Sequence, residues 1–230
     1  MGAPGLDALA IDTRLGELQP EFWSAAGETV IMASSALLIG GALGLALGLG
    51  LYLTRAGALF ANRPLFIVLN VVVNFFRPIP FIIFIAALQP LARHVVGTGI
   101  GIRAATFGIT VAAVFGISRI VEQNLVTVSP GVIEAARAMG ASRTRITLTV
   151  LVPEALGPLV LGYTFAFVAI VDMTAIAGVI AGGGLGSFAQ RFGFRQFDQV
   201  VMWAAILVLV AMVMLIQLGG NVLARRILRR

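Results

Sequence analysis

The sequence contains no lysine and no cysteine, and its single histidine is His94. Without lysine the chain cannot form a Walker A loop, in which a lysine reaches the nucleotide phosphates, so we expect no ATP site of that kind. Without cysteine there is no disulfide framework, no thiol nucleophile and no cysteine-ligated zinc site. His94 lies in a predicted loop and has no companion ligand. We therefore predict no metal site, no catalytic residues and no cofactor held by this chain.

Charged residues are also scarce. They make up 11% of the 230 residues, whereas 59% are hydrophobic. A soluble domain of this length needs much more polar surface, so lipid is predicted to be the main solvent. The sixteen basic residues are all arginine and are scattered around apolar runs instead of forming one basic face. The composition therefore predicts membrane lipid as a partner and argues against nucleic acid.

Five apolar segments are long enough to cross a bilayer, which takes about 20 residues at a helical rise of about 1.5 Å. The third is the weakest, because Arg119 and Glu122 interrupt its second half. These two residues lie near one end, so we expect their charged heads to reach the membrane interface. We predict an all-α integral membrane protein with five transmembrane helices, at about residues 30–53, 65–92, 104–126, 155–181 and 200–220.

The arginines predict the direction of the chain through the membrane, because short cytoplasmic segments carry an excess of them. With the C-terminus inside, the cytoplasmic side holds Arg55, Arg63, Arg119, Arg137, Arg143, Arg145, Arg225, Arg226, Arg229 and Arg230, and the outer side holds Arg14, Arg93, Arg103, Arg191 and Arg195. The N-terminus is therefore predicted to lie outside. This divides the chain into a periplasmic lead-in (1–25), a transmembrane domain (26–222) and a basic cytoplasmic tail (223–230).

One predicted cytoplasmic segment differs from the apolar runs on either side of it, and residues 134–153 read EAARAMGASRTRITLTVLVP. Ser129-Pro130 predicts a helix start, because serine is a favoured N-cap and proline suits the first helical position. Glu134 then falls in the early part of the helix, where the helix dipole favours a carboxylate. Gly140 is a typical C-terminal stop for this first helix.

A second short helix is predicted next, in which Ser142 is the cap and Pro153 ends or kinks the helix at the entry to the fourth crossing. The small side chains of Ala135 and Ala136 let another backbone approach closely, and Met139 offers an adaptable apolar contact. These features favour either a docking element for a soluble partner or an ordinary capped loop at the membrane interface. A DNA-binding helix–turn–helix is a poor alternative, because the segment is tethered between two crossings.

The same segment resembles the EAA motif of ABC importer permeases, since it has EAA at 134–136, glycine at 140 and V-x-V-P at 150–153. The family pattern ends in I-x-L-P, so the departure is mild and keeps the apolar character. The resemblance implies that the first helix is a coupling helix, seated in a groove of a cytoplasmic ATPase subunit. The implied ATPase-coupling residues are Glu134, Ala135, Ala136, Met139 and Gly140.

Further segments resemble the methionine-uptake permeases within that family: NFFRPIPFIIFI at 74–85, RIVEQNL at 119–125, EAARAMGA at 134–141 and AGGGLGSFAQRFGF at 181–194. The likeness covers most of residues 25–225. It implies a permease subunit in a bacterial inner membrane that imports methionine (D or L) or a close analogue. The implied partners are a second copy of the chain, a dimer of cytoplasmic ATP-binding cassette subunits that binds ATP and magnesium, and a periplasmic or lipid-anchored substrate-binding protein.

Ionisable residues inside the predicted crossings are candidates for the substrate pathway. Arg77 lies near the middle of the second crossing, where a cation costs about 2.5–3.5 kcal/mol unless it is paired or hydrated. Pro78 and Pro80 bend that helix and expose carbonyls, so Arg77 either faces a lined cavity or caps those carbonyls. Asp172 lies toward the outer third of the fourth crossing, where the resemblance implies a small neutral residue. The candidate pathway residues are Asn74, Arg77, Asp172 and Met173.

Two glycine-rich stretches have structural interpretations. Ala36, Gly40, Gly44 and Gly48 recur every four residues in the first crossing, a spacing that permits close helix packing in lipid. Residues 182–186 read GGGLG, but a Rossmann phosphate loop would follow a strand, and this run follows a predicted membrane helix. We therefore expect it to form a sharp turn between the fourth and fifth crossings.

Two functions remain open at the level of the residues. The first is a permease that receives ATP-driven work from a partner through residues 130–145. The second is a self-sufficient ion-coupled transporter or channel that uses Arg77 and Asp172 as its relay. Five crossings give no inverted repeat, and the charged residues are too few for an obvious proton chain, so the first function is favoured.

Overall fold

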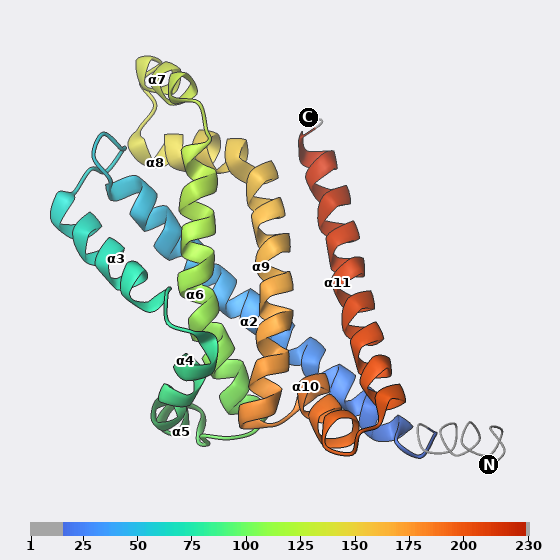
Figure 1. Ribbon diagram of the computed structural model, residues 1–230. Coiled ribbons are helices and arrows are strands. Elements are labelled where there is room, and N and C mark those ends of the chain that lie inside the picture. Colours follow the sequence, from blue (N-terminus) through green and yellow to red (C-terminus); the bar gives the residue numbers. More distant parts are fainter. Residues whose placement is uncertain (1–15, 229–230) are drawn as a thin grey trace, which may run out of the picture. The chain divides into compact units, whose positions relative to one another are not determined.

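The computed structural model describes residues 16–228, and within this range every regular element is a helix (Figure 1). The expected all-α architecture is therefore confirmed for the described chain. The π-helical elements carry the label η. The elements are α2 (Gln19–Thr54), α3 (Arg63–Phe76), α4 (Phe81–Ala87), α5 (Gln89–Val96), α6 (Ile102–Val126), α7 (Pro130–Ala138), α8 (Arg143–Ile146), η1 (Thr147–Leu151), α9 (Val152–Ala181), α10 (Gly184–Phe188), η2 (Ala189–Phe194) and α11 (Gln199–Leu228).

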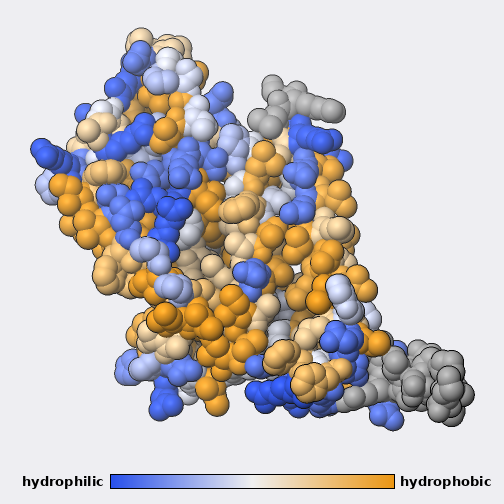
Figure 2. All heavy atoms as spheres, viewed as in Figure 1, coloured by the Kyte–Doolittle hydropathy of each residue, from blue (hydrophilic) through white to orange (hydrophobic). Residues whose placement is uncertain are grey.

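Four helical runs are long and apolar enough to cross a membrane: α2, α6, the run Arg143–Ile180 that contains α9, and α11. The pair α3 and α4 adds a fifth candidate if the two helices form one broken span. Large apolar side chains are exposed on these elements, such as Phe165 on α9 and Leu207 on α11. Figure 2 shows this apolar surface along α11. Such a surface suits a lipid environment, because the free-energy cost of exposing apolar side chains to water is absent in hydrocarbon.

The ends of two long helices differ from the predicted ones. The first helix begins at Gln19, well before the predicted start near residue 30. Its charged first turn does not prevent this, because Glu21 is favoured by the helix dipole and Phe22 is buried. At the other end of the chain, α11 continues through the predicted basic tail as far as Leu228. The predicted lead-in therefore overlaps α2, and residues 1–15 lie outside the described chain.

The predicted second crossing, residues 65–92, is divided into α3, α4 and part of α5. Asn62 caps α3 by accepting a hydrogen bond from the Leu65 N–H at 3.1 Å. The helix ends at Phe76, because Pro78 and Pro80 have no N–H to continue its hydrogen bonds. The bend expected at these prolines is thus a complete break, and Arg77 caps the end of α3 instead of lying inside a helix.

The described chain divides into two compact units. Within the described residues, unit 1 comprises 16–35, Phe81–Ile109 and Val171–Met214, and unit 2 comprises Ala36–Pro80, Thr110–Ile170 and 215–228. The divisions fall inside α2, α6, α9 and α11, so each of these helices contributes to both units. Unit 1 has a core of Phe22, Ala25, Ala26, Leu185, Phe188, Val201 and Ala205.

Within unit 2, the small residues of α2 pack against α6, as the sequence predicts. A Cβ atom on Gly40 would lie 2.9 Å from the Ala113 Cβ, and one on Gly44 would lie 2.9 Å from the Ile117 Cβ. Both distances are too short for ordinary contact, so only glycine allows this approach. The expectation of close helix packing along this stripe is confirmed.

Candidate functional site

Helix α7 carries the EAA sequence and forms where the local signals predict it. Ser129 occupies the N-cap position and Pro130 begins the helix, although the Ser129 side chain makes no capping hydrogen bond. The helix ends at Ala138, and Gly140 follows with a positive φ of 78°. This left-handed conformation is the one that glycine adopts easily after a helix. The expected C-terminal stop is confirmed, whereas Glu134 lies in the middle of this short helix and not in its first turn.

Helix α8 begins at the predicted cap, because the Ser142 Oγ accepts a hydrogen bond from the Arg145 N–H at 3.3 Å. Pro153 does not end the helical run, contrary to one of the two expectations for it. The π-helix η1 precedes the proline, and the Val152 N–H bonds to the Thr147 carbonyl five residues back. The wider π turn accommodates the residue that cannot donate, so the run continues into α9.

A small apolar cluster fastens α7 to the rest of unit 2. Ala136 is 3% exposed and packs with Leu59 from the loop after α2 and with Ile146 of α8. Further apolar contacts come from Leu53, Ile133, Ala141 and Val150. The Ala141 N–H also donates to the Ala136 carbonyl at 3.2 Å and closes the turn. The last alanine of EAA thus anchors the helix, because its side chain is buried in this apolar cluster.

The other coupling candidates lie on the outer surface of α7. Glu134, Ala135 and Gly140 are exposed, and Met139 is 81% exposed. Helix α7 lies at the edge of unit 2, beyond the C-terminal end of α6 (Figure 1). These residues present one large apolar side chain, two small residues and one carboxylate, and Val132 and Arg137 of α7 are exposed as well. This surface has the chemistry of a docking helix, and the coupling role of its residues stays a prediction.

A cavity of about 130 Å³ separates α7 from the segment that follows α2. Its lining includes Glu134 and Arg137 of α7, together with Tyr52 and Arg55. The Arg55 guanidinium lies over the Tyr52 ring at 4.3 Å from the ring centre, which holds this cation in place. Glu134 thus lines this cavity together with two arginines.

A polar cluster that was not predicted from the sequence joins α3 to α6 in unit 2. Arg119 forms an ion pair with Glu122 and donates to the Oδ1 atoms of Asn70 and Asn74, the latter at 2.7 Å. The Asn74 amide in turn donates to Asn70 at 3.3 Å. The side chains of Arg119 and Glu122 are only 15% and 13% exposed, so they turn into the protein instead of reaching outward as expected.

The sequence signal for this cluster was present in α3. Asn70 and Asn74 are four residues apart on an apolar helix, so they share one face. Opposite them, Arg119 and Glu122 are three residues apart on α6 and also share a face. When these two faces meet, the polar groups of one pair can form hydrogen bonds with those of the other pair. A buried pair that is fully hydrogen-bonded avoids the cost of an isolated charge.

The candidate pathway residues do not form one described group. Asn74 belongs to the polar cluster, and Arg77 is exposed at the end of α3, both in unit 2. Asp172 is exposed and Met173 is half-buried on α9, and both belong to unit 1. The predicted substrate pathway through these four residues therefore stays a prediction.

The glycine run after α9 makes the expected sharp turn in unit 1. Gly182, Gly183 and Gly184 have φ values of 87°, 99° and 70°, which other residues rarely adopt. Two side chains of α2 hold the turn: the Glu28 Oε2 accepts from the Gly184 N–H at 2.7 Å, and the Thr29 Oγ1 accepts from the Leu185 N–H at 2.9 Å. These contacts to α2 could not be read from the sequence, because they join residues 156 positions apart.

Comparison with known proteins identifies the family to which this chain, with its EAA segment, belongs. The model of the binding-protein-dependent transport system inner membrane component matches residues 44–230. The chain belongs to this family. The match contains the whole segment from α7 to η1, and it supports a multi-pass protein of a bacterial inner membrane.

Individual relatives are permeases for methionine. The chain is 38% identical over 204 residues to the probable D-methionine transport system permease protein MetI of Vibrio cholerae, which covers 89% of this chain and 91% of the relative. It is also 38% identical over 210 residues to the methionine import system permease protein MetP of Bacillus subtilis, which covers 91% and 95%. The resemblance to the methionine-uptake permeases is confirmed.

Solved structures agree with the sequence relatives. An inward-facing conformation of the MetNI methionine ABC transporter superposes with a TM-score of 0.87 at 38% identity, over 90% of this chain and 98% of that chain. An amino acid ABC transporter crystallised with histidines superposes with a TM-score of 0.76 at 18% identity. This second likeness shows the shared fold alone.

Proposed function

We propose that this chain is the membrane permease subunit of an ATP-driven importer for methionine or a close analogue. The observation that carries the proposal is the exposed α7 surface on a chain of this family. The relatives at 38% identity are named as methionine permeases, and the MetNI structure is a methionine ABC transporter. An apolar amino acid also suits a chain with so few charged residues.

The energy for transport comes from a separate subunit in this proposal. The chain has no lysine for a Walker A loop, so ATP and magnesium are bound by a cytoplasmic ATPase dimer. Glu134, Ala135, Met139 and Gly140 provide its docking surface, and Ala136 anchors that surface to unit 2. ATP-driven closure of the ATPase dimer then moves α7 and switches the pathway between its inward-facing and outward-facing states.

The orientation of the chain follows from the arginine distribution. We place α7 and the C-terminal end of α11 in the cytoplasm, where Arg137, Arg143, Arg145, Arg225 and Arg226 obey the positive-inside rule. The start of α2 and the turn after α9 then face the outside. A substrate-binding protein delivers methionine on that side, and a second copy of the chain completes the translocation pathway.

The ion-coupled alternative has less support. It needs Arg77 and Asp172 to act as one relay, and charged residues make up only 11% of the chain, too few for an obvious proton chain. The family match also places the chain among components of binding-protein-dependent systems, which transport with the help of other subunits.

Uptake into vesicles tests the proposal. The chain is reconstituted with its ATPase subunit and its binding protein, and ATP-dependent uptake of labelled methionine is measured against a panel of unlabelled amino acids. We expect uptake that requires both ATP and the ATPase, with D- and L-methionine as the strongest competitors. Uptake by vesicles that contain the chain alone, driven by an ion gradient, would support the alternative instead.

A further inference from the structure

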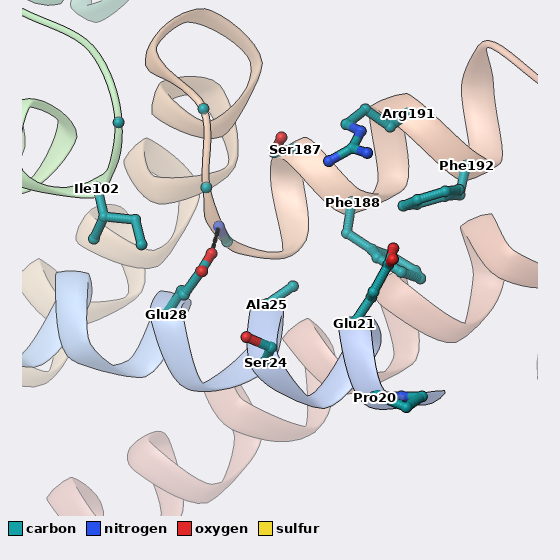
Figure 3. Close-up of a pocket in the computed structure, with 14 residues that line it drawn as sticks. Pro20, Glu21, Ser24, Ala25, Glu28, Ile102, Ser187, Phe188, Arg191 and Phe192 are labelled. Atoms are coloured by element: carbon teal, nitrogen blue, oxygen red, sulfur yellow. Dashed lines mark hydrogen bonds between the residues drawn. The ribbon is translucent and has the colours of Figure 1, made fainter. Parts of the chain in front are cut away.

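Unit 1 contains a cavity of about 690 Å³ that the transport mechanism described above does not use (Figure 3). Its walls are the first part of α2, residues 101–102, the glycine turn 182–184, and the segment from α10 to η2. This volume lies in the range of small-molecule binding sites, which is about 300–1,000 Å³. With the orientation proposed above, the cavity lies on the outer side of the membrane.

Opposite charges line two sides of this cavity. Glu21 and Glu28 project from α2 toward the segment that carries Ser187 and Arg191 (Figure 3). Within residues 16–228, neither carboxylate forms an ion pair with Arg191. The cavity therefore offers an acidic side and a basic side that remain available to a bound molecule.

One residue on each side is held by a contact within unit 1, whereas Glu21 and Arg191 are exposed to the surroundings. Glu28 is half-buried, and its Oε2 is fixed by the Gly184 N–H at 2.7 Å, which leaves the second carboxylate oxygen for another donor. The Arg191 guanidinium lies 4.9 Å from the centre of the Phe192 ring, a cation–π contact that restrains it. Preorganised charges bind more tightly than mobile ones, because less freedom is lost on binding.

Apolar and glycine residues complete the lining. Phe188, Phe192 and Ile102 provide apolar surface, and Ser24 and Ser187 provide hydroxyl groups. A Cβ atom on Gly183 would lie 2.7 Å from the Ile102 Cγ1 and 3.5 Å from the Glu28 Oε2. A larger residue at position 183 would therefore push on the wall that positions Glu28.

We propose that this cavity is a binding site for a zwitterionic α-amino acid with an apolar side chain. The ammonium group binds Glu21 and Glu28, the carboxylate binds Arg191, and the side chain packs on the aromatic rings. Guanidinium groups bind carboxylates through paired, charge-assisted hydrogen bonds, which suits this role. The choice of methionine as the ligand, and the outer position of the site, rest on the proposed function. The site receives the amino acid before it enters the membrane pathway.

Ligands that lack one charge test the assignment. The full chain is placed in lipid nanodiscs, and equilibrium dialysis measures the binding of L-methionine, N-acetyl-L-methionine, which has no ammonium group, and L-methionine amide, which has no carboxylate. The variants are Arg191→Gln, Glu28→Gln and Glu21→Gln. Glutamine at position 28 keeps an oxygen that can accept from the Gly184 N–H, so the turn is preserved. The exposed residues Arg195 and Glu17 provide the controls Arg195→Gln and Glu17→Gln.

We expect the unmodified chain to prefer methionine to both derivatives. Arg191→Gln should weaken methionine binding about tenfold and remove the preference over methionine amide. Glu28→Gln, and to a lesser extent Glu21→Gln, should remove the preference over N-acetylmethionine. The two control variants should bind as the unmodified chain does.

Two results would overturn the site. The first is that the chain shows no saturable methionine binding. The second is that every variant changes the preference for methionine over N-acetylmethionine and over methionine amide to the same extent. The uptake assay separates this outcome from failure of the transport proposal. If the reconstituted importer still takes up methionine and the nanodisc assay shows no binding, only the cavity assignment fails. If methionine uptake is also absent, the proposed function itself fails.

Discussion

Two short connectors lie on either side of α9 in the chain, and they differ in the contacts that hold them to other helices. The EAA connector is residues 129–151, and the glycine connector is residues 182–198. Both contain a short α-helix, a π-helix and glycine at positive φ. In the EAA connector Met139 is 81% exposed, whereas the glycine connector buries Gly184, Leu185 and Phe188 in α10 and exposes Phe194 and Phe197 after it.

The difference shows how similar local elements serve different roles. The EAA connector is fastened by a few apolar contacts around Ala136 and leaves one helix surface free. The glycine connector is fastened on more sides: Glu28 and Thr29 bond to its backbone, and Phe188 packs edge-on against Phe22 with ring centres 5.4 Å apart. The first arrangement suits contact with a partner, and the second suits the shaping of a cavity.

The largest stability effect is expected at Gly184. Alanine there must adopt a φ of 70°, and its Cβ would lie 2.7 Å from the Met32 Cε and 2.8 Å from the Thr29 Oγ1. We expect Gly184→Ala to lower the free energy of unfolding by about 3 kcal/mol. Gly27→Ala is the control, because nothing lies within 4 Å of a Cβ at that position. Thermal unfolding in detergent measures both, and equal midpoints would show that the glycine connector is not tightly fastened.

A smaller loss is expected inside the EAA connector. Ala136→Asn places an unpaired amide in the apolar cluster and should cost about 2 kcal/mol. Ala135→Asn changes an exposed neighbour and should stay within about 0.5 kcal/mol of the unmodified chain. The same unfolding assay compares them. If the two variants are equally stable, α7 is not anchored through Ala136.

The two serine caps of the EAA connector provide the finest comparison. Ser142 accepts a hydrogen bond from the Arg145 N–H, and Ser129 makes no such bond. We expect Ser142→Ala to cost about 1 kcal/mol and Ser129→Ala to have little effect. Denaturant titration of both variants measures the difference. A larger effect at Ser129 would reverse the expected order.

Features set by neighbouring residues could be predicted from the sequence. Apolar length predicted the long helices α2, α6, α9 and α11, Ser142 and Gly140 predicted the limits of α8 and α7, and the α2 glycines predicted close packing. The start of α2 was predicted too late, because the apolar run begins near residue 30, whereas the first turn of a helix accepts the carboxylate of Glu21.

Features that depend on distant contacts could not be predicted. The inward turn of Arg119 depends on Asn70 and Asn74 of another helix, 49 and 45 positions away. The cavity in unit 1 likewise needs α2 and the glycine connector to meet, which no local pattern indicates. The π turn before Pro153 is a local feature, but helix periodicity does not distinguish it from an ordinary turn.

Co-purification with the ATPase subunit tests the central claim, that the exposed surface of α7 is the docking site. Glu134→Arg reverses the charge on this surface, and Gly140→Val alters its end because valine disfavours the φ of 78°. The control is Gln123→Arg, an exposed position near the end of α6. We predict that both α7 variants insert into the membrane but lose the ATPase, whereas the control retains it. A complex of undiminished yield with both α7 variants would contradict the account.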